Sequence, residues 1–139
     1  MDQNTWIYYG AFLEESAKRN LLEYVKNFVD IQEDWKIYCD HMTIIYNDGS
    51  ENAAMWSENM DSLLGSAVHL IVTHIGTSDR CIAVKVSGFS SNNVNPHITV
   101  AIAPGAKPVE SNKITNWYGV ADGIGLTAKI NVITKRPKA

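Results

Sequence analysis

The residues best suited to chemistry form a short motif that occurs twice in the chain. The tetrapeptides "HMTI" at 41–44 and "HITV" at 97–100 both read histidine, any residue, threonine, apolar residue, and they lie 56 residues apart. An imidazole can accept or donate a proton near neutral pH, and a hydroxyl can donate a hydrogen bond. Two such pairs in one place would supply an acid, a base and two hydrogen-bond donors.

Each motif lies in a stretch that alternates as a strand does. Residues i and i+2 of a strand point to the same face of a sheet. His41 and Thr43 would therefore share one face, while Met42 and Ile44 point into the core. The second motif has the same arrangement, so two such strands side by side would form a cleft lined by two histidines and two threonines.

A competing interpretation treats the repeat as coincidence. A single His-x-Thr sequence arises by chance, and a lone histidine is usually a structural residue, which is our interpretation of His69 and His74. On this view the chain is a globular interaction module, and His41 and His97 should lie far apart.

The remaining sequence predicts one α+β domain over residues 1–139, with a mostly antiparallel sheet. Helical periodicity follows the first strand and recurs after the first motif, and polar loops separate most elements. Strands are expected at 5–13, 36–47, on both sides of "GTSD" within 67–88, at 97–103 and at 125–135, and helices at 14–29, at 51–65 and after Pro108.

The composition argues against a protein that holds a long duplex nucleic acid. The chain has 139 residues, of which 45% are hydrophobic, and a formal net charge of −3. A protein that holds a long duplex nucleic acid by its backbone is normally basic. The charge instead suits a small anionic ligand, or an RNA end held by a few local cations.

The cysteines and the termini give further expectations. Cys39 and Cys81 are far apart, and a structural zinc site needs about four clustered ligands, so we expect free thiols and no metal. No apolar run approaches the roughly 18–20 residues of a membrane span, and the N-terminus has no signal-peptide pattern. These features predict a soluble cytoplasmic protein that does not bind a membrane.

The paired motifs resemble the signature of the 2H phosphoesterase superfamily. The segment "HITVAIAPGAKPVESN" is similar to the second motif of the cyclic phosphodiesterase module of plant and fungal tRNA ligases, where a glycine-containing turn and a Glu-small-Asn segment, here Glu110-Ser111-Asn112, follow the His-x-Thr strand. The segment "HLIVTHIGTSDRCIAVKVSG" is similar to the strand pair that precedes it. The resemblance covers about residues 36–116.

This resemblance implies a bilobal α+β fold, with antiparallel sheets around a central groove and helices outside. It also implies metal-independent hydrolysis of a nucleotide phosphodiester, without a cofactor. His41 and His97 would be the general acid and base, and Thr43 and Thr99 would donate hydrogen bonds to the phosphate. The resemblance leaves open which histidine is the acid and which ribose oxygen leaves.

The tRNA-ligase module implies a 2′,3′-cyclic phosphate, on an RNA end or a mononucleotide, opened to a monoester. One alternative is cleavage of a cyclic oligonucleotide second messenger, as small stand-alone 2H proteins of phages do to blunt host signalling; the protein would then act in the host cytoplasm. A second alternative is a non-catalytic nucleotide-binding protein. The oligomeric state is not set by the sequence.

Four further residues are candidates for substrate binding. Tyr8 and Tyr9 lie on the first strand, and one of them must share a face with whatever that strand borders. Lys107 follows the second motif and could place positive charge near the phosphate. Trp117 follows the last helical segment and could stack on a base. Core packing or a solvated surface is the alternative for each.

Overall fold

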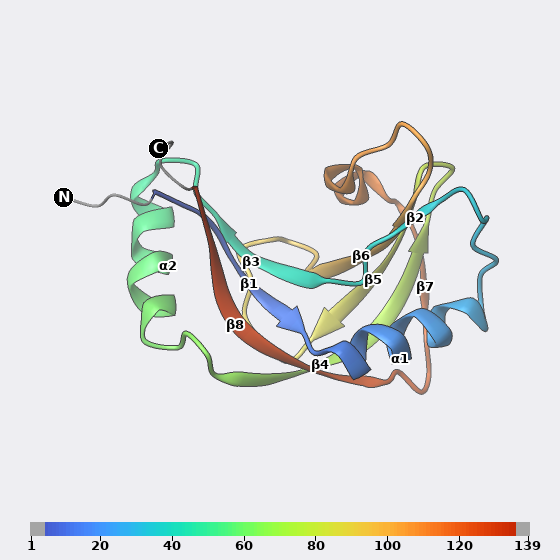
Figure 1. Ribbon diagram of the computed structural model, residues 1–139, viewed down its shortest axis with the longest axis horizontal. Coiled ribbons are helices and arrows are strands. Elements are labelled where there is room, and N and C mark those ends of the chain that lie inside the picture. Colours follow the sequence, from blue (N-terminus) through green and yellow to red (C-terminus); the bar gives the residue numbers. More distant parts are fainter. Residues whose placement is uncertain (1–4, 136–139) are drawn as a thin grey trace.

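A strongly curved sheet, with helices on its outer side, forms the framework of the molecule (Figure 1). The computed structural model describes residues 5–135. The elements in chain order are β1 (Thr5–Leu13), α1 (Glu15–Lys26), β2 (Lys36–Ile37), β3 (His41–Tyr46), α2 (Glu51–Asp61), β4 (Ala67–Thr77), β5 (Cys81–Ser87), β6 (His97–Ile102), the 3₁₀ helix η1 (Pro108–Lys113), β7 (Asn116–Gly119) and β8 (Gly125–Lys135). The predicted α+β class is confirmed.

The pairing of the strands explains the curvature. The order in the sheet is β2-β6-β3-β1-β8-β4-β5, with β7 beside β4, and β5 also pairs with β6, so the order closes on itself. Every one of these pairings is antiparallel. Strand β6 therefore lies between β3 on one edge and β5 on the other, which brings the two predicted motifs into neighbouring strands.

The two motif strands bury their apolar alternate residues, as the alternation predicts. Met42, Ile44, Ile98 and Val100 have no exposed surface. Burying a side chain of this size contributes about 1.5–3 kcal/mol. The core thus fixes the face on which the histidines and threonines lie.

The helices pack their apolar stripes on the outside of this sheet. Helix α1 buries Ala17, Leu21 and Val25, which recur every four residues and so share one face. Helix α2 is capped at its N-terminus by Ser50, whose hydroxyl accepts a hydrogen bond from the amide of Ala53. No helix in the range 5–135 has both the length and the apolar character needed to span a membrane.

Several element boundaries differ from the expectation, and the first helix, expected over 14–29, ends at Lys26. The strand predicted over 36–47 is divided into β2 and β3, because Cys39 adopts a positive φ of 52° between them. The helix expected over 51–65 ends at Asp61, and the helical segment expected after Pro108 begins at Pro108 as a 3₁₀ helix. Strand β7 was not predicted, since its four residues are too few for a periodic pattern.

A β-bulge in β3 decides which aromatic residue reaches the concave face. In the pairing of β1 with β3, Tyr9 faces Ile45 while Gly10 faces Thr43, so Ile44 is an extra residue. Without it, the alternation that begins at His41 would turn Ile45 toward the concave face. The bulge instead buries Ile45 and leaves Tyr46 on the concave side, beside Tyr8.

Candidate functional site

The two His-x-Thr motifs lie side by side in the sheet. Met42 of β3 pairs with Ile98 of β6 in an antiparallel register, which places His41 beside Thr99 and Thr43 beside His97. Cα atoms directly opposite one another in such a pair are about 4.5–5.5 Å apart, and diagonal ones about 7–8 Å. The coincidence interpretation predicted distant histidines, and the structure places them in adjacent strands.

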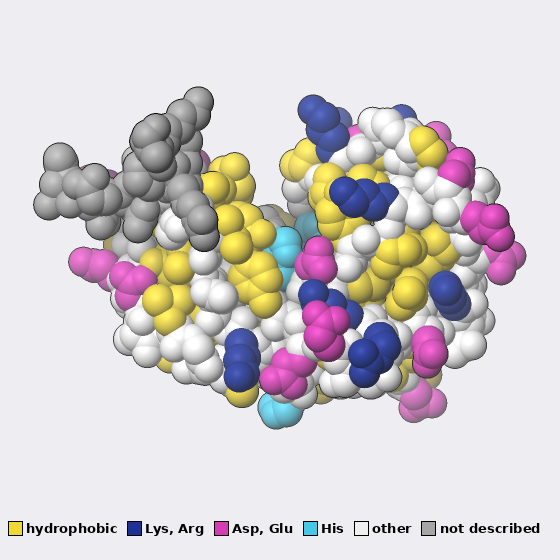
Figure 2. Space-filling model, viewed as in Figure 1, with side chains coloured by type: hydrophobic (Ala, Val, Ile, Leu, Met, Phe, Trp, Pro, Cys, Tyr) yellow, Lys and Arg dark blue, Asp and Glu magenta, His cyan; other side chains and the backbone are white. Residues whose placement is uncertain are grey.

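All four motif residues line one cavity of about 740 Å³. The space-filling view shows a notch between the two arms of the molecule, with histidine at its floor and apolar side chains on its walls (Figure 2). A cavity of this size is typical of a small-molecule site. Its other lining residues are Tyr8, Phe12, Lys18, Tyr38, Asp40, Tyr46, Asn93, Pro108, Val109 and Asn112.

His41 is held by aromatic rings. Its imidazole stacks on Tyr8 with 5.0 Å between ring centroids, and Phe12 lies at the same distance. No hydrogen bond joins the His41 ring to another residue in the described range. Burial lowers the pKa of His41, His97 acts in the same direction, and the nearby Asp40 carboxylate opposes both. His41 therefore favours the neutral form, which can accept a proton.

Gly10 makes room for this stack. It lies between Tyr8 and Phe12 on the same face of β1 and faces Thr43. A Cβ atom at this position would lie 3.1 Å from the Met42 carbonyl oxygen and 3.4 Å from the His41 ring. A side chain here would press on the backbone of β3 and on the Phe12 ring, 3.2 Å away, before it pressed on the imidazole.

His97 is oriented by a hydrogen bond instead of by stacking. Its Nδ1 lies 2.8 Å from the carbonyl oxygen of Asn95. A carbonyl can only accept, so Nδ1 carries the proton and donates it. The other ring nitrogen, Nε2, is then available to exchange a proton with a bound ligand.

The two threonines differ in how they are held. The Thr99 hydroxyl lies 2.9 Å from the hydroxyl of Ser111, a side chain of η1 that is only 1% exposed. The Thr43 hydroxyl has no such partner in the described part of the chain, and its carbonyl accepts a hydrogen bond from Ser91. Thr99 is therefore prepositioned by a neighbour, and Thr43 is held by its strand.

An ion pair joins η1 to the turn between β4 and β5. The Arg80 guanidinium donates to both carboxylate oxygens of Glu110, at 2.5 Å and 3.2 Å, and to the Gly105 carbonyl. The same carboxylate accepts the Lys107 amide at 2.8 Å. The Arg80 side chain holds the pKa of Glu110 at about 2, so this clamp stays ionised at any ordinary pH.

The four additional candidates have separate locations. Tyr8 lines the cavity, whereas Tyr9 is 3% exposed on the opposite face, where its hydroxyl contacts Ser57 and Asp61. Lys107 and Trp117 do not line the cavity. The Trp117 indole instead packs over Gly76 and donates a hydrogen bond to the Ile114 carbonyl at 3.0 Å.

Sequence reasoning missed several lining residues. Phe12 was available from alternation, because it lies two positions beyond Gly10 and four beyond Tyr8 on the same strand face. Tyr46 reaches the cavity only because of the bulge in β3, which the sequence does not reveal. Tyr38 and the residues of helix α1 and η1 reach the cavity through tertiary packing.

The positive charge at the cavity wall is largely neutralised. Lys18 of α1 lies 3.5 Å from Asp40 and 3.5 Å from Glu15. An ammonium between two carboxylates attracts an additional anion only weakly. The buried thiol of Cys39 adds no nucleophile, because burial raises its pKa to about 12.

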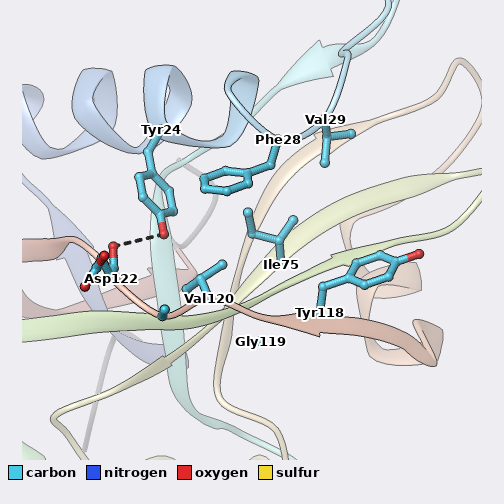
Figure 3. A pocket seen from close by; sticks show the side chains of 9 residues that line it. Tyr24, Phe28, Val29, Ile75, Tyr118, Gly119, Val120 and Asp122 are labelled. Atoms are coloured by element: carbon cyan, nitrogen blue, oxygen red, sulfur yellow. Dashed lines mark hydrogen bonds between the residues drawn. The ribbon is translucent and has the colours of Figure 1, made fainter.

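A second cavity, of about 500 Å³, lies on another part of the molecule (Figure 3). Its walls are Tyr24, Phe28, Val29, Ile75 and residues 118–122. The Tyr24 hydroxyl already donates to the Asp122 carbonyl at 3.3 Å. This cavity contains neither motif and no paired titratable groups, so the larger cavity is the candidate site.

The arrangement at the larger cavity combines a neutral imidazole, an oriented imidazole and two hydroxyls. Within residues 5–135, no group of three His, Cys, Asp or Glu side chains could hold a metal ion. No protein-family model matches the chain, and no curated protein matches it either. The chemistry available at this cavity is therefore judged from the two motifs and their geometry.

Proposed function

We propose that the protein is a 2H-type phosphoesterase that hydrolyses a nucleotide phosphodiester without a metal ion. The observation that carries this proposal is the pairing of Met42 with Ile98, which gathers both His-x-Thr motifs at the floor of one cavity. The bent sheet, with the cavity between its two arms, is compatible with the two-lobed fold of that superfamily.

The states of the two histidines support a division of roles. His41, kept neutral by burial, takes a proton from the attacking water. In this division of roles His97, whose Nδ1–H is held by the Asn95 carbonyl, must enter the cycle as the imidazolium, and it donates its Nε2 proton to the leaving ribose oxygen. One P–O bond to water oxygen forms as one P–O bond to ribose breaks, and solvent then restores both histidines.

The threonines would stabilise charge on the phosphate. Thr99 can donate to a non-bridging oxygen while its own oxygen accepts from Ser111. Thr43, on the other strand, would donate to the second non-bridging oxygen. Donors placed before the reaction are most effective where charge grows in the transition state.

The walls suit a nucleoside. Tyr46 is 61% exposed beside Tyr8 on one wall, and Tyr38 lies on the other. Stacking of a base on an aromatic ring contributes about 1–3 kcal/mol. With the sequence resemblance to the tRNA-ligase module, these features favour a 2′,3′-cyclic phosphate opened to a monoester.

The proposal is tested by turnover of a substrate panel in excess EDTA. The panel contains 2′,3′-cyclic mononucleotides, RNA ending in a cyclic phosphate, and cyclic di- and trinucleotides. His41→Ala and His97→Ala should abolish EDTA-resistant turnover, and His69→Ala, which changes an exposed histidine on β4, should retain it. Binding without turnover would identify a nucleotide-binding protein, and the absence of both would refute the proposal.

A further inference from the structure

A row of cationic and imidazole side chains continues from the cavity across the sheet. Lys85 of β5 pairs directly with His97 of β6, and on its other side it pairs with His74 of β4. Residues directly opposite in neighbouring strands point to the same face. Lys85 and His74 therefore lie on the concave face, in line with His97.

Lys85 has no carboxylate partner among the residues that the structure describes. Its side chain is partly buried, and none of the ion pairs in residues 5–135 includes it. Its ammonium lies over the Trp117 ring, 4.8 Å from the centroid. The indole gives the ammonium a defined place through a cation–π contact, but it leaves the charge without an anion.

In its lack of an ion pair, Lys85 differs from Lys18, a second cation near the site. Lys18 is paired with Glu15 and Asp40 and is largely neutralised. A partly desolvated cation without a counter-ion favours an anionic ligand, and both strand neighbours of Lys85 are imidazoles. Lys85 does not itself line the cavity, but it adjoins His97, which does, so an anion held by Lys85 would lie at the cavity's edge beside the scissile phosphate.

We propose that Lys85 binds a second phosphate of the substrate, one nucleotide linkage away from the phosphate that is cleaved. This inference rests on the proposed function and deepens it: the preferred substrate has at least two phosphates, so a mononucleoside cyclic phosphate occupies only part of the site. The second phosphate belongs either to a linear RNA end or to a cyclic oligonucleotide, and both supply the same chemistry. Trp117 positions the lysine and does not stack on a base.

The test measures binding, so that it does not depend on turnover. In the His41→Ala background, affinities are measured for a mononucleoside 2′,3′-cyclic phosphate, for a dinucleotide that ends in a cyclic phosphate, and for a cyclic dinucleotide. Lys85→Met removes the charge and keeps the unbranched stem that packs on Trp117. Lys85→Arg restores the charge, and Lys26→Met makes the same charge change on the outer helix α1.

Lys85→Met should weaken the binding of a two-phosphate ligand by about tenfold, as expected for the loss of a hydrogen bond to a charged group. The slope of log affinity against log salt should fall by about 0.7, the value for one phosphate contact on a single strand. The one-phosphate ligand should bind unchanged, Lys85→Arg should retain affinity, and Lys26→Met should have no effect. Whichever of the linear and cyclic ligands loses affinity identifies the source of the second phosphate.

Two results would overturn the inference, and they are distinguishable. In the first result, the His41→Ala protein binds the ligands, but Lys85→Met lowers the affinity for neither two-phosphate ligand, or lowers the affinity for all three ligands equally. The second phosphate subsite is then wrong, and the proposed function stands. If no ligand binds with or without the substitution, and wild-type protein also has no turnover, both proposals fail together.

Discussion

The hydrogen bond between Thr99 and Ser111 allows a quantitative test of how the proposed phosphate site is organised. Ser111→Ala removes a buried hydroxyl 2.9 Å from the Thr99 oxygen. Thr99 then keeps only the longer contact to the Pro108 carbonyl, at 3.5 Å, as a local partner. Its hydroxyl would be free to rotate away from the substrate.

The size of the effect follows from the net strength of one neutral hydrogen bond, about 0.5–1.5 kcal/mol. If that energy serves to orient Thr99, kcat/KM should fall by about two- to tenfold. Ser57→Ala, which removes the hydroxyl that contacts Tyr9 on the opposite face, is the matched control and should leave kcat/KM unchanged.

The assay is a double-mutant cycle on kcat/KM with Thr99→Val, which removes the second hydroxyl and keeps the shape of the side chain. Once Thr99 has no hydroxyl, Ser111→Ala should have no further effect. Equal losses in both backgrounds would show that Ser111 acts by another route. No loss in either background would refute the reasoning that this bond orients Thr99.

Three further predictions concern the fold around the site. Burial lowers the pKa of His41 in the folded protein, so as the pH falls the His41 imidazole is protonated in the unfolded chain before it is protonated in the folded one. The free energy of unfolding should therefore fall as the pH drops below about 6.5. Urea titrations of wild type and His41→Gln should give free energies that diverge in that range, and the same pH dependence for both proteins would contradict the prediction. Gly10→Ala should lower kcat/KM far more than it lowers the melting temperature, since the new methyl group presses on the Met42 carbonyl and on the Phe12 ring that packs against His41, and so shifts the imidazole indirectly; an unchanged kcat/KM would show that the ring position does not matter. Leu21→Ala should reduce the free energy of unfolding by about 2–5 kcal/mol in urea titrations and leave kcat of the folded protein unchanged; a loss below that range would show that α1 repacks easily.

The motif strands were predictable because their pattern has a single explanation. In "HMTI" and "HITV" the apolar residues alternate with polar ones, so one face must be core and the other must carry the histidines. The class of fold followed from the order of such segments. That β3 and β6 are neighbours did not follow, since pairing between segments so distant in the chain is set by tertiary contacts.

The parts that were missed depend on local irregularities. The sequence "TIIY" does not show that Ile44 is an extra residue, so Tyr46 was not expected in the cavity. The left-handed Cys39 does not stand out, because cysteine has no special preference for that conformation. Trp117 remained a candidate for stacking on a base, because the sequence cannot show that Gly76 leaves space beneath its ring.

The position of β6 between β3 and β5 also has a consequence for refolding. Pairing of Met42 with Ile98 closes a long loop, and contacts so distant in sequence form slowly because the chain must first lose entropy. An intermediate that has formed β1, β3 and β8 but has not inserted β6 contains only one histidine of the pair. If the protein has the proposed turnover, its recovery after dilution from denaturant should therefore mark the insertion of the sixth strand, a step that circular dichroism of the helices would not detect.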